Sequence, residues 1–222
     1  MRRLKHTARA GFTMIEVMIS LGILTSLLLL SAMVSNSSRG AYGQATTAAD
    51  LVAEAKLVVD RVAIELQIAS TGTFNPELNA GVRNTSSLTF QQLVDIVGGA
   101  PVYGGPDPNE VMSLQLLYAN GELDDGIDNN GDGLADERQL VLTRNIGAGS
   151  QVSTTLCSNI SEFLEGEFVG GGDENGNGLV DEAGFDIERN GDVLTIRLSV
   201  EGQNSRGETM VRTVETAVRL RN

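Results

Sequence analysis

The 222-residue sequence has no tryptophan, four prolines, one cysteine and one histidine. Its single cysteine, Cys157, cannot form an internal disulfide and is best interpreted as a small buried apolar residue. The single histidine, His6, lies close to the N-terminus, so the rest of the chain lacks the base for a Ser-His or Cys-His pair and for a histidine-bearing zinc site. We therefore expect a protein that is not an enzyme.

Basic residues are also scarce, with 16 Lys and Arg against 29 Asp and Glu and a formal net charge of −13. A surface this acidic repels phosphate, so nucleic acid is not an expected partner. The first ten residues, in contrast, are positively charged, because they carry Arg2, Arg3, Lys5 and Arg9 and no acid. By the positive-inside rule, this short basic end stays in the cytoplasm and the rest of the chain crosses to the other side of a membrane.

A long apolar run, residues 12–34, contains one ionisable side chain, Glu16. At about 1.5 Å per residue, a helix of this length crosses a bilayer. A secretory signal would place its cleavage site after the apolar run. Here the candidate junction, Gly11-Phe12, comes before the run, so we expect the apolar segment to remain in the mature protein.

The segment Gly11-Phe12-Thr13-Met14-Ile15-Glu16 resembles the processing site of type IV prepilins and type II secretion pseudopilins. The resemblance implies that a prepilin peptidase cuts between Gly11 and Phe12 and that Phe12 is N-methylated. It also implies that Glu16 pairs with the terminal amine of Phe12 in a neighbouring subunit. The alternative, a plain signal anchor, leaves unexplained an acid that costs roughly 2.5–3.5 kcal/mol inside a membrane span.

The same resemblance implies the partners and the location of the protein. The partners are other pilin or pseudopilin subunits, the prepilin peptidase and an inner-membrane assembly platform. The location is the bacterial inner membrane, with the head periplasmic or extracellular, and then a pilus or pseudopilus. The chain as a whole most resembles W-type minor pilins and J-type minor pseudopilins, which sit near the filament tip. A major pilin and a non-polymerising, membrane-anchored, calcium-dependent binding module are the alternatives.

We expect four segments: a cleaved leader (1–11), a membrane and filament-core helix (12–35), its continuation (36–70) and a β-rich head (71–222). A helical stripe supports the continuation, because apolar residues recur every three or four positions. These residues are Leu51, Ala55, Val58, Val62, Leu66 and Ala69. Two helices hinged near Gly40 are the alternative. The predicted fold class is α+β, with a long N-terminal helix packed on an antiparallel sheet, as in pilins.

Beyond Gly72 the apolar runs shorten and indicate strands. The expected strands are 111–118, 139–143, 163–169, 185–188, 193–200 and 210–220. Residues 88–97 are read as a strand or a short helix, and residues 98–108 as a loop. The Asn190-Gly191 pair predicts a hairpin with a type I′ turn.

Two copies of the pattern D-x-N-G-[DN]-G-L-x-D-E begin at Asp128 and Asp173. The spacing of their oxygen-bearing residues matches the first nine positions of an EF-hand calcium loop. The expected ligands are Asp128, Asn130, Asp132, Leu134 (carbonyl), Asp136 and Glu137 in the first copy, and Asp173, Asn175, Asn177, Leu179 (carbonyl), Asp181 and Glu182 in the second.

The glutamate of EF-hand position 12 is missing, because Gln139 and Gly184 stand there. Glu137 and Glu182 are possible substitutes, and Asp124 and Asp125 could supplement the first copy. The pattern therefore resembles the extracellular calcium loops of thrombospondins or dockerins more than a helix-loop-helix sensor.

Electrostatics favours calcium in these segments. Residues 124–137 contain six carboxylates and no basic residue, and two such charges 4 Å apart repel by about 4 kcal/mol at an effective dielectric constant near 20. One or two Ca²⁺ ions would remove this repulsion and staple the connections between strands. The alternative is a solvated Asn/Gly/Asp turn.

Overall fold

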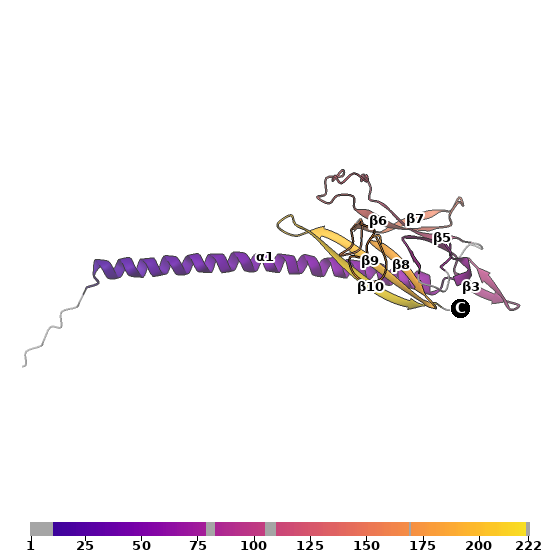
Figure 1. The fold of residues 1–222 in the computed structure, drawn as a ribbon, viewed down its shortest axis with the longest axis horizontal. Coiled ribbons are helices and arrows are strands. Elements are labelled where there is room, and N and C mark those ends of the chain that lie inside the picture. The colour runs from indigo at the N-terminus through magenta and orange to yellow at the C-terminus, as the bar shows by residue number, and fades with distance from the viewer. Residues whose placement is uncertain (1–10, 79–82, 105–109, 169, 221–222) are drawn as a thin grey trace, which may run out of the picture. The chain divides into compact units, whose positions relative to one another are not determined.

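The computed structural model describes residues 11–78, 83–104, 110–168 and 170–220 (Figure 1). The basic leader, with His6, lies outside the described residues. The chain divides into two compact units, Met1–Gly43 and Gln44–Asn222. The architecture is α+β, a long N-terminal helix followed by an antiparallel β-sheet head, as the sequence predicts.

Helix α1 runs from Met14 to Gln67. Its backbone stays helical through Gly40 and Gly43, so the alternative of two separate helices is wrong. No proline occurs before Pro76, and a glycine inside a helix costs only about 1 kcal/mol relative to alanine. A long helix absorbs that cost without a break.

In the first unit, the apolar side chains of α1 are exposed on every side of the helix. The most apolar 18-residue window of α1 has a mean hydropathy of 2.3 and none of it is buried, so by length and composition it can cross a membrane. The hydroxyls of Thr25 and Ser26 both donate to the carbonyl of Gly22, at 2.9 Å. Such internal bonding is what a polar group in hydrocarbon requires.

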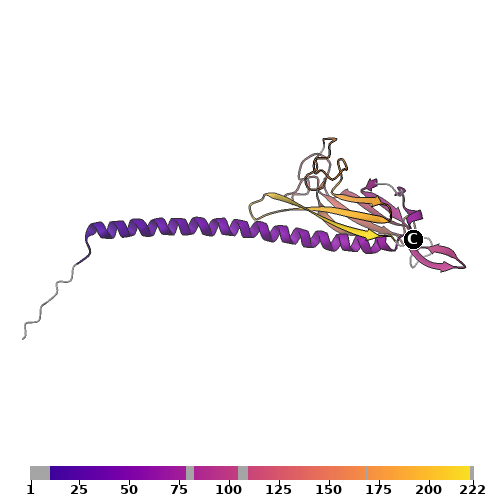
Figure 2. The same cartoon turned by 60° about the horizontal axis from the view of Figure 1, so that its bottom comes forward.

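In the second unit, α1 lies along one face of the sheet (Figures 1 and 2). The predicted stripe is confirmed: its members are all buried in one core. Glu65 is buried beside this stripe at 4% exposure. It pairs with Arg61 at 2.7 Å and with Arg144 of the sheet at 3.0 Å, so the buried carboxylate has charged partners.

The main sheet has eight strands in the order β1-β8-β9-β7-β6-β5-β2, with β10 also paired to β9, and every pairing is antiparallel. The strands are β1 (Arg83–Thr85), β2 (Ser87–Phe90), β5 (Met112–Tyr118), β6 (Arg138–Arg144), β7 (Val152–Ile160), β8 (Phe185–Asn190), β9 (Val193–Gln203) and β10 (Thr209–Arg219). A separate hairpin is formed by β3 (Leu93–Val97) and β4 (Ala100–Tyr103).

Strand β9 is the centre of the core. The alternation of Leu194, Ile196, Leu198 and Val200 predicted a half-buried strand, and all four are fully buried. Phe74 and Phe90 add an edge-to-face aromatic contact, with ring centroids 6.4 Å apart. Cys157 is buried in the same core, and burial raises the pKa of its thiol to about 11.

Two predictions about the head are wrong in detail, and strands β1 and β7 were not predicted. The strand expected at 163–169 is absent from its described part: Gly166 has a φ of 91°, and only an isolated bridge joins Phe163 to Ala183. Strand β7 was missed because it is rich in Ser and Thr and mostly exposed. Strand β4 lies where a loop was expected; residues 105–109 of that loop are outside the described residues.

The β8–β9 hairpin is confirmed, but its turn is not the expected one. Asn190 pairs with Val193, so the two turn residues are Gly191 and Asp192. Of these two, Gly191 has a positive φ, 62°. Glycine with positive φ at the first turn position alone is the pattern of a type II′ turn, the other turn favoured in hairpins.

Candidate functional site

The first candidate site is the junction between Gly11 and Phe12. Both residues precede α1 in non-helical backbone, and the Phe12 side chain is 84% exposed. No heavy atom beyond its chain neighbours lies within 4 Å of the Cβ position of Gly11. The described side of the candidate junction is therefore exposed.

Glu16 caps its own helix. Its Oε2 accepts the backbone N–H of Thr13 at 3.0 Å and the Thr13 hydroxyl at 2.9 Å, and Thr13 Oγ1 accepts the N–H of Glu16 at 3.3 Å. The Thr13 carbonyl accepts the N–H of Val17, so Thr13 is the N-cap residue. This is the capping box of pattern T-x-x-E, which the sequence contains and which sequence reasoning missed. In the single chain, the Glu16 carboxylate thus has its hydrogen-bond donors in the first turn of its own helix.

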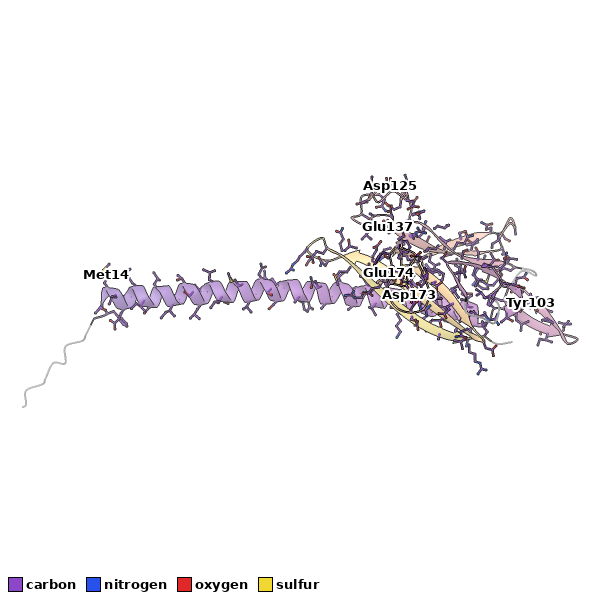
Figure 3. All side chains as sticks on the ribbon, in the orientation of Figure 1. Met14, Tyr103, Asp125, Glu137, Asp173 and Glu174 are labelled. Carbon is purple, nitrogen blue, oxygen red and sulfur yellow. The ribbon has the colours of Figure 1, made fainter. Side chains whose placement is uncertain are left out.

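The second candidate site is a pair of acidic loops. Loop 1 (residues 119–137) joins β5 to β6, and loop 2 (residues 164–182) lies between β7 and β8. The base of loop 1 is tied to the segment before loop 2 by Arg138, whose Nη2 lies 3.1 Å from Glu162 Oε1. The same guanidinium lies over the Tyr118 ring, 4.5 Å from its centroid. Figure 3 shows labelled residues of both loops.

The repeat is longer than the ten-residue pattern. Residues 121–137 (GELDDGIDNNGDGLADE) and 166–182 (GEFVGGGDENGNGLVDE) align without gaps. Left-handed backbone occurs at five matched positions, which have closely similar φ angles in the two loops: Gly121 and Gly166 (99° and 91°), Gly126 and Gly171 (74° and 69°), Gly131 and Gly176 (81° and 76°), Gly133 and Gly178 (97° and 91°), and Asp136 and Asp181 (57° and 51°). The two loops therefore share a left-handed backbone conformation at these five matched positions.

The acid at the first position of each motif is bonded to its own loop. Asp128 accepts the N–H groups of Gly131 and Gly133, at 2.6 and 2.8 Å. Asp173 likewise accepts those of Gly176 and Gly178, at 2.7 and 2.8 Å. Both oxygens of each carboxylate are engaged, so these side chains hold the backbone of their own loops.

Most other predicted ligands also bond to loop backbone. The side-chain oxygens at the third and fifth motif positions each accept the N–H two residues later: Asn130 from Asp132, Asp132 from Leu134, Asn175 from Asn177, and Asn177 from Leu179. Asp136 accepts the N–H groups of Asp125 and Gly126. Asp125 itself accepts the N–H of Ile127.

Sequence reasoning missed a buried glutamate ahead of each motif. Glu122 accepts the N–H groups of Asn129, Asn130 and Asp136. Its counterpart Glu167 accepts the N–H of Asn175 at 3.0 Å, and its Oε2 is buried with no hydrogen-bond partner in the described structure. The signal that would have found both is the gap-free alignment that extends upstream of the ten-residue pattern.

The last residue of each motif carries an orphaned oxygen. Glu137 and Glu182 are each 1% exposed, and the Oε2 of each has no hydrogen-bond partner among the described residues. Their Oε1 atoms accept the amides of Asn130 and Asn177, both at 2.6 Å. Burial raises the pKa of Glu137, and the charges of Asp132 and Glu122 raise it further. Burying a carboxylate oxygen without a hydrogen bond costs free energy of folding, and a bound cation would remove that cost.

Strand β9 brings another buried acid to loop 1. Glu201 is 8% exposed, and its Oε1 also has no partner in the described structure. Burial raises its pKa to about 7, and the nearby charges of Glu137 and Asp132 add to the shift. The neighbouring Gln203 donates its amide to the carbonyl of Gly133, which fastens loop 1 to β9.

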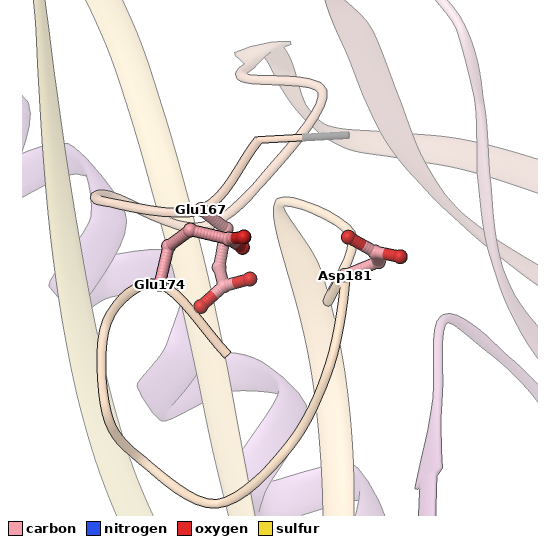
Figure 4. A group of neighbouring side chains, drawn as sticks. All are labelled: Glu167, Glu174 and Asp181. Carbon is pink, nitrogen blue, oxygen red and sulfur yellow. The ribbon is translucent and has the colours of Figure 1, made fainter. Parts of the chain in front are cut away.

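Three carboxylates converge in loop 2: Glu167, Glu174 and Asp181 (Figure 4). One oxygen from each lies within 4.8 Å of those of the other two. Only Asp181 belongs to the predicted ligand set. Among the described residues, these three acidic side chains form the group that lies close enough to share one metal ion.

Comparison with known proteins found a match to one segment of the chain. Residues 6–32 match the family model described as the prokaryotic N-terminal methylation motif. No curated protein and no solved structure matches the chain. The motif covers the candidate cleavage junction, Thr13, Glu16 and most of the apolar run, and it points to a structural subunit rather than an enzyme.

Proposed function

We propose that this chain is a pilin or pseudopilin subunit that prepilin peptidase cuts between Gly11 and Phe12. The observation that carries the proposal is the coincidence of three features within residues 6–32. These are the methylation motif, an exposed junction just before a helix, and an apolar helix with nothing packed on it within its unit. Removal of the basic leader would leave the apolar helix as the N-terminus of the mature protein.

The proposed assembly partner is another subunit of the same kind. The uncovered apolar surface of residues 12–34 suits either a bilayer or the packed helical core of a filament. Glu16 would exchange its hydrogen bonds with Thr13 for the amine of a neighbouring Phe12. We further propose a minor subunit near the tip of a type IV pilus or type II secretion pseudopilus, with its head directed away from the cytoplasm.

The test of processing is N-terminal analysis of the protein purified from cells with and without the peptidase. A mature chain that begins with N-methylphenylalanine at position 12, together with recovery in sheared filaments, supports a filament subunit. A chain that retains Met1 and stays in the membrane supports the alternative, an anchored calcium-dependent module. The ratio of this chain to other subunits in sheared filaments separates a minor from a major subunit.

We also propose that the acidic loops bind Ca²⁺ and thereby staple the connections between strands. The buried oxygens of Glu137 and Glu182 that lack a hydrogen-bond partner in the described structure support this proposal, because they stand at matched positions of two loops whose φ angles agree at five positions. Oxygen donors of this kind suit a hard cation. An unfolding curve of the full chain in detergent, with Ca²⁺ and with chelator, tests the proposal.

A further inference from the structure

Loop 2 contains a cation site whose members differ from those that its EF-hand-like pattern suggests. The pattern places the ion on Asp173, Asn175, Asn177 and Asp181. In the structure, however, both oxygens of the Asp173 carboxylate accept N–H groups of its own loop, whereas in the described structure Asp181 uses one oxygen, Oδ1, in this way, for Gly170 and Gly171. The carboxylates that face one another are Glu167, Glu174 and Asp181, with oxygen atoms within 4.8 Å of each other (Figure 4).

An independent observation points to a ligand at this cluster. Glu167 is 8% exposed, and its Oε2 is buried without a hydrogen-bond partner in the described structure. Loop 2 itself, residues 164–182, contains no Lys, Arg or His. Three carboxylates held this close repel one another unless a cation lies between them.

The backbone of loop 2 makes room for the third carboxylate. A Cβ at Gly172 would collide with Glu174 Oε1, and one at Gly170 would lie 3.0 Å from the same atom. The two glycines therefore allow the Glu174 side chain to lie against the loop. Because Oε1 is the end of a flexible side chain, a methyl group at Gly172 would displace the carboxylate without disturbing the backbone.

Loop 1 shows what the same position does without an acid. Asn129 stands where loop 2 has Glu174, and Ile127 stands where loop 2 has Gly172. The Asn129 amide donates to Asp125 Oδ1 and to the Ile127 carbonyl, both at 2.9 Å. Loop 1 thus closes this corner with hydrogen bonds from a neutral amide to the Asp125 carboxylate and a carbonyl. Loop 2 has Gly170 in place of Asp125 and Glu174 in place of Asn129, so its third carboxylate has no such amide donor at this position.

We propose that Glu167, Glu174 and Asp181 bind one Ca²⁺ ion in loop 2. This inference rests on the calcium binding proposed above for the head and assigns its ligands in this loop. Flexible, carboxylate-rich coordination completed by water suits Ca²⁺ better than Mg²⁺, which demands near-ideal octahedral geometry. The site ties the segment after β7 to the segment before β8.

The test is calcium titration of the full chain in detergent micelles by isothermal titration calorimetry. We expect Glu174→Gln to remove one bound ion per chain, or to weaken one site at least tenfold, with an unchanged circular dichroism spectrum. Gly172→Ala should weaken the same site by displacing Glu174. The matched control is Asp192→Asn, which removes one charge outside both loops and should titrate like the wild type.

Three results would overturn the assignment. The first is wild-type binding by Glu174→Gln together with loss of an ion in Asp173→Asn, which would restore the EF-hand-like ligand set. The second is tighter binding of Mg²⁺ than of Ca²⁺ at the affected site. The third is a wild-type chain that binds no Ca²⁺ at millimolar concentration, which would also remove the proposed calcium loops. The proposed filament function would survive all three, because N-terminal processing tests it separately.

Discussion

Replacing Glu201 by glutamine should stabilise the calcium-free head at neutral pH and reduce its sensitivity to pH. The Glu201 carboxyl has a pKa raised from 4.5 to about 7, chiefly by burial and then by the charge of Glu137. The folded head therefore holds this proton more tightly than the unfolded chain does. The carboxyl costs no stability below about pH 4.5 and progressively more as pH rises toward 7.

The magnitude follows from the difference between the two pKa values. At about 1.4 kcal/mol per unit, ionising Glu201 costs the fold about 3 kcal/mol once the pH is above 7. Glutamine keeps the size of the side chain and cannot ionise. For a head of this size, about 3 kcal/mol corresponds to a rise of about 6–12 °C in Tm near neutral pH, whereas near pH 4.5 the variant and the wild type should differ little.

The assay is thermal unfolding of the full chain in detergent with chelator, followed by circular dichroism across this pH range. The wild-type curve also contains the titration of Asp186, whose pKa is raised to about 7 chiefly by burial. The difference between the wild type and Glu201→Gln isolates Glu201. A variant whose Tm follows the wild-type pH profile would refute the reasoning, because it would show that Glu201 is solvated in the folded head.

Three further predictions concern the core, the calcium loops and the membrane helix. Leu66→Ala, at a fully buried position, should lower the free energy of unfolding of the head by about 2–5 kcal/mol in urea denaturation, because it leaves a cavity. Chelation should lower the Tm of the wild type, and Asp128→Ala or Asp132→Ala should lose part of the stabilisation by millimolar Ca²⁺ seen in the same melting assay. Glu16→Val should leave membrane insertion and cleavage intact but reduce recovery in sheared filaments.

Each of these predictions has a control or a contrary result. Leu57→Ala lies on the exposed side of the same helix and should change stability by less than about 0.5 kcal/mol; an equal loss from both variants would contradict the assigned core. A wild-type melting curve that chelator leaves unchanged would count against the calcium loops. Normal filament recovery of Glu16→Val would remove its proposed role, and Met18→Leu in the same span should assemble normally.

The sequence predicts those parts of the fold that depend on regular periodicity. The four-residue spacing of Val58, Val62 and Leu66 identified the buried face of α1, and strict alternation identified β9. Strand β7 was not predicted, because its Ser and Thr side chains are mostly exposed and its two faces do not differ in hydrophobicity. Strand β4 was not predicted, because the glycine and proline residues around it are typical of a loop.

The candidate sites also divide into one that a local sequence pattern predicts and one that it does not. The roles of Gly11, Phe12 and Glu16 were predicted from a short local pattern, and the family model covers the same segment. The cluster in loop 2 was not predictable from the ten-residue pattern. Glu167 lies upstream of that pattern, Glu174 occupies one of its variable positions, and both meet Asp181 only through the backbone path of the loop.

Arg138 contacts the bases of both loops. It stacks on Tyr118 at the base of loop 1 and pairs with Glu162 just ahead of loop 2. Mechanical load or heat that dislodges this one guanidinium would loosen both connections at once. Loss of this contact should therefore affect both loops, although each keeps a contact of its own with the sheet, Gln203 with Gly133 in loop 1 and Thr213 with Glu165 in loop 2.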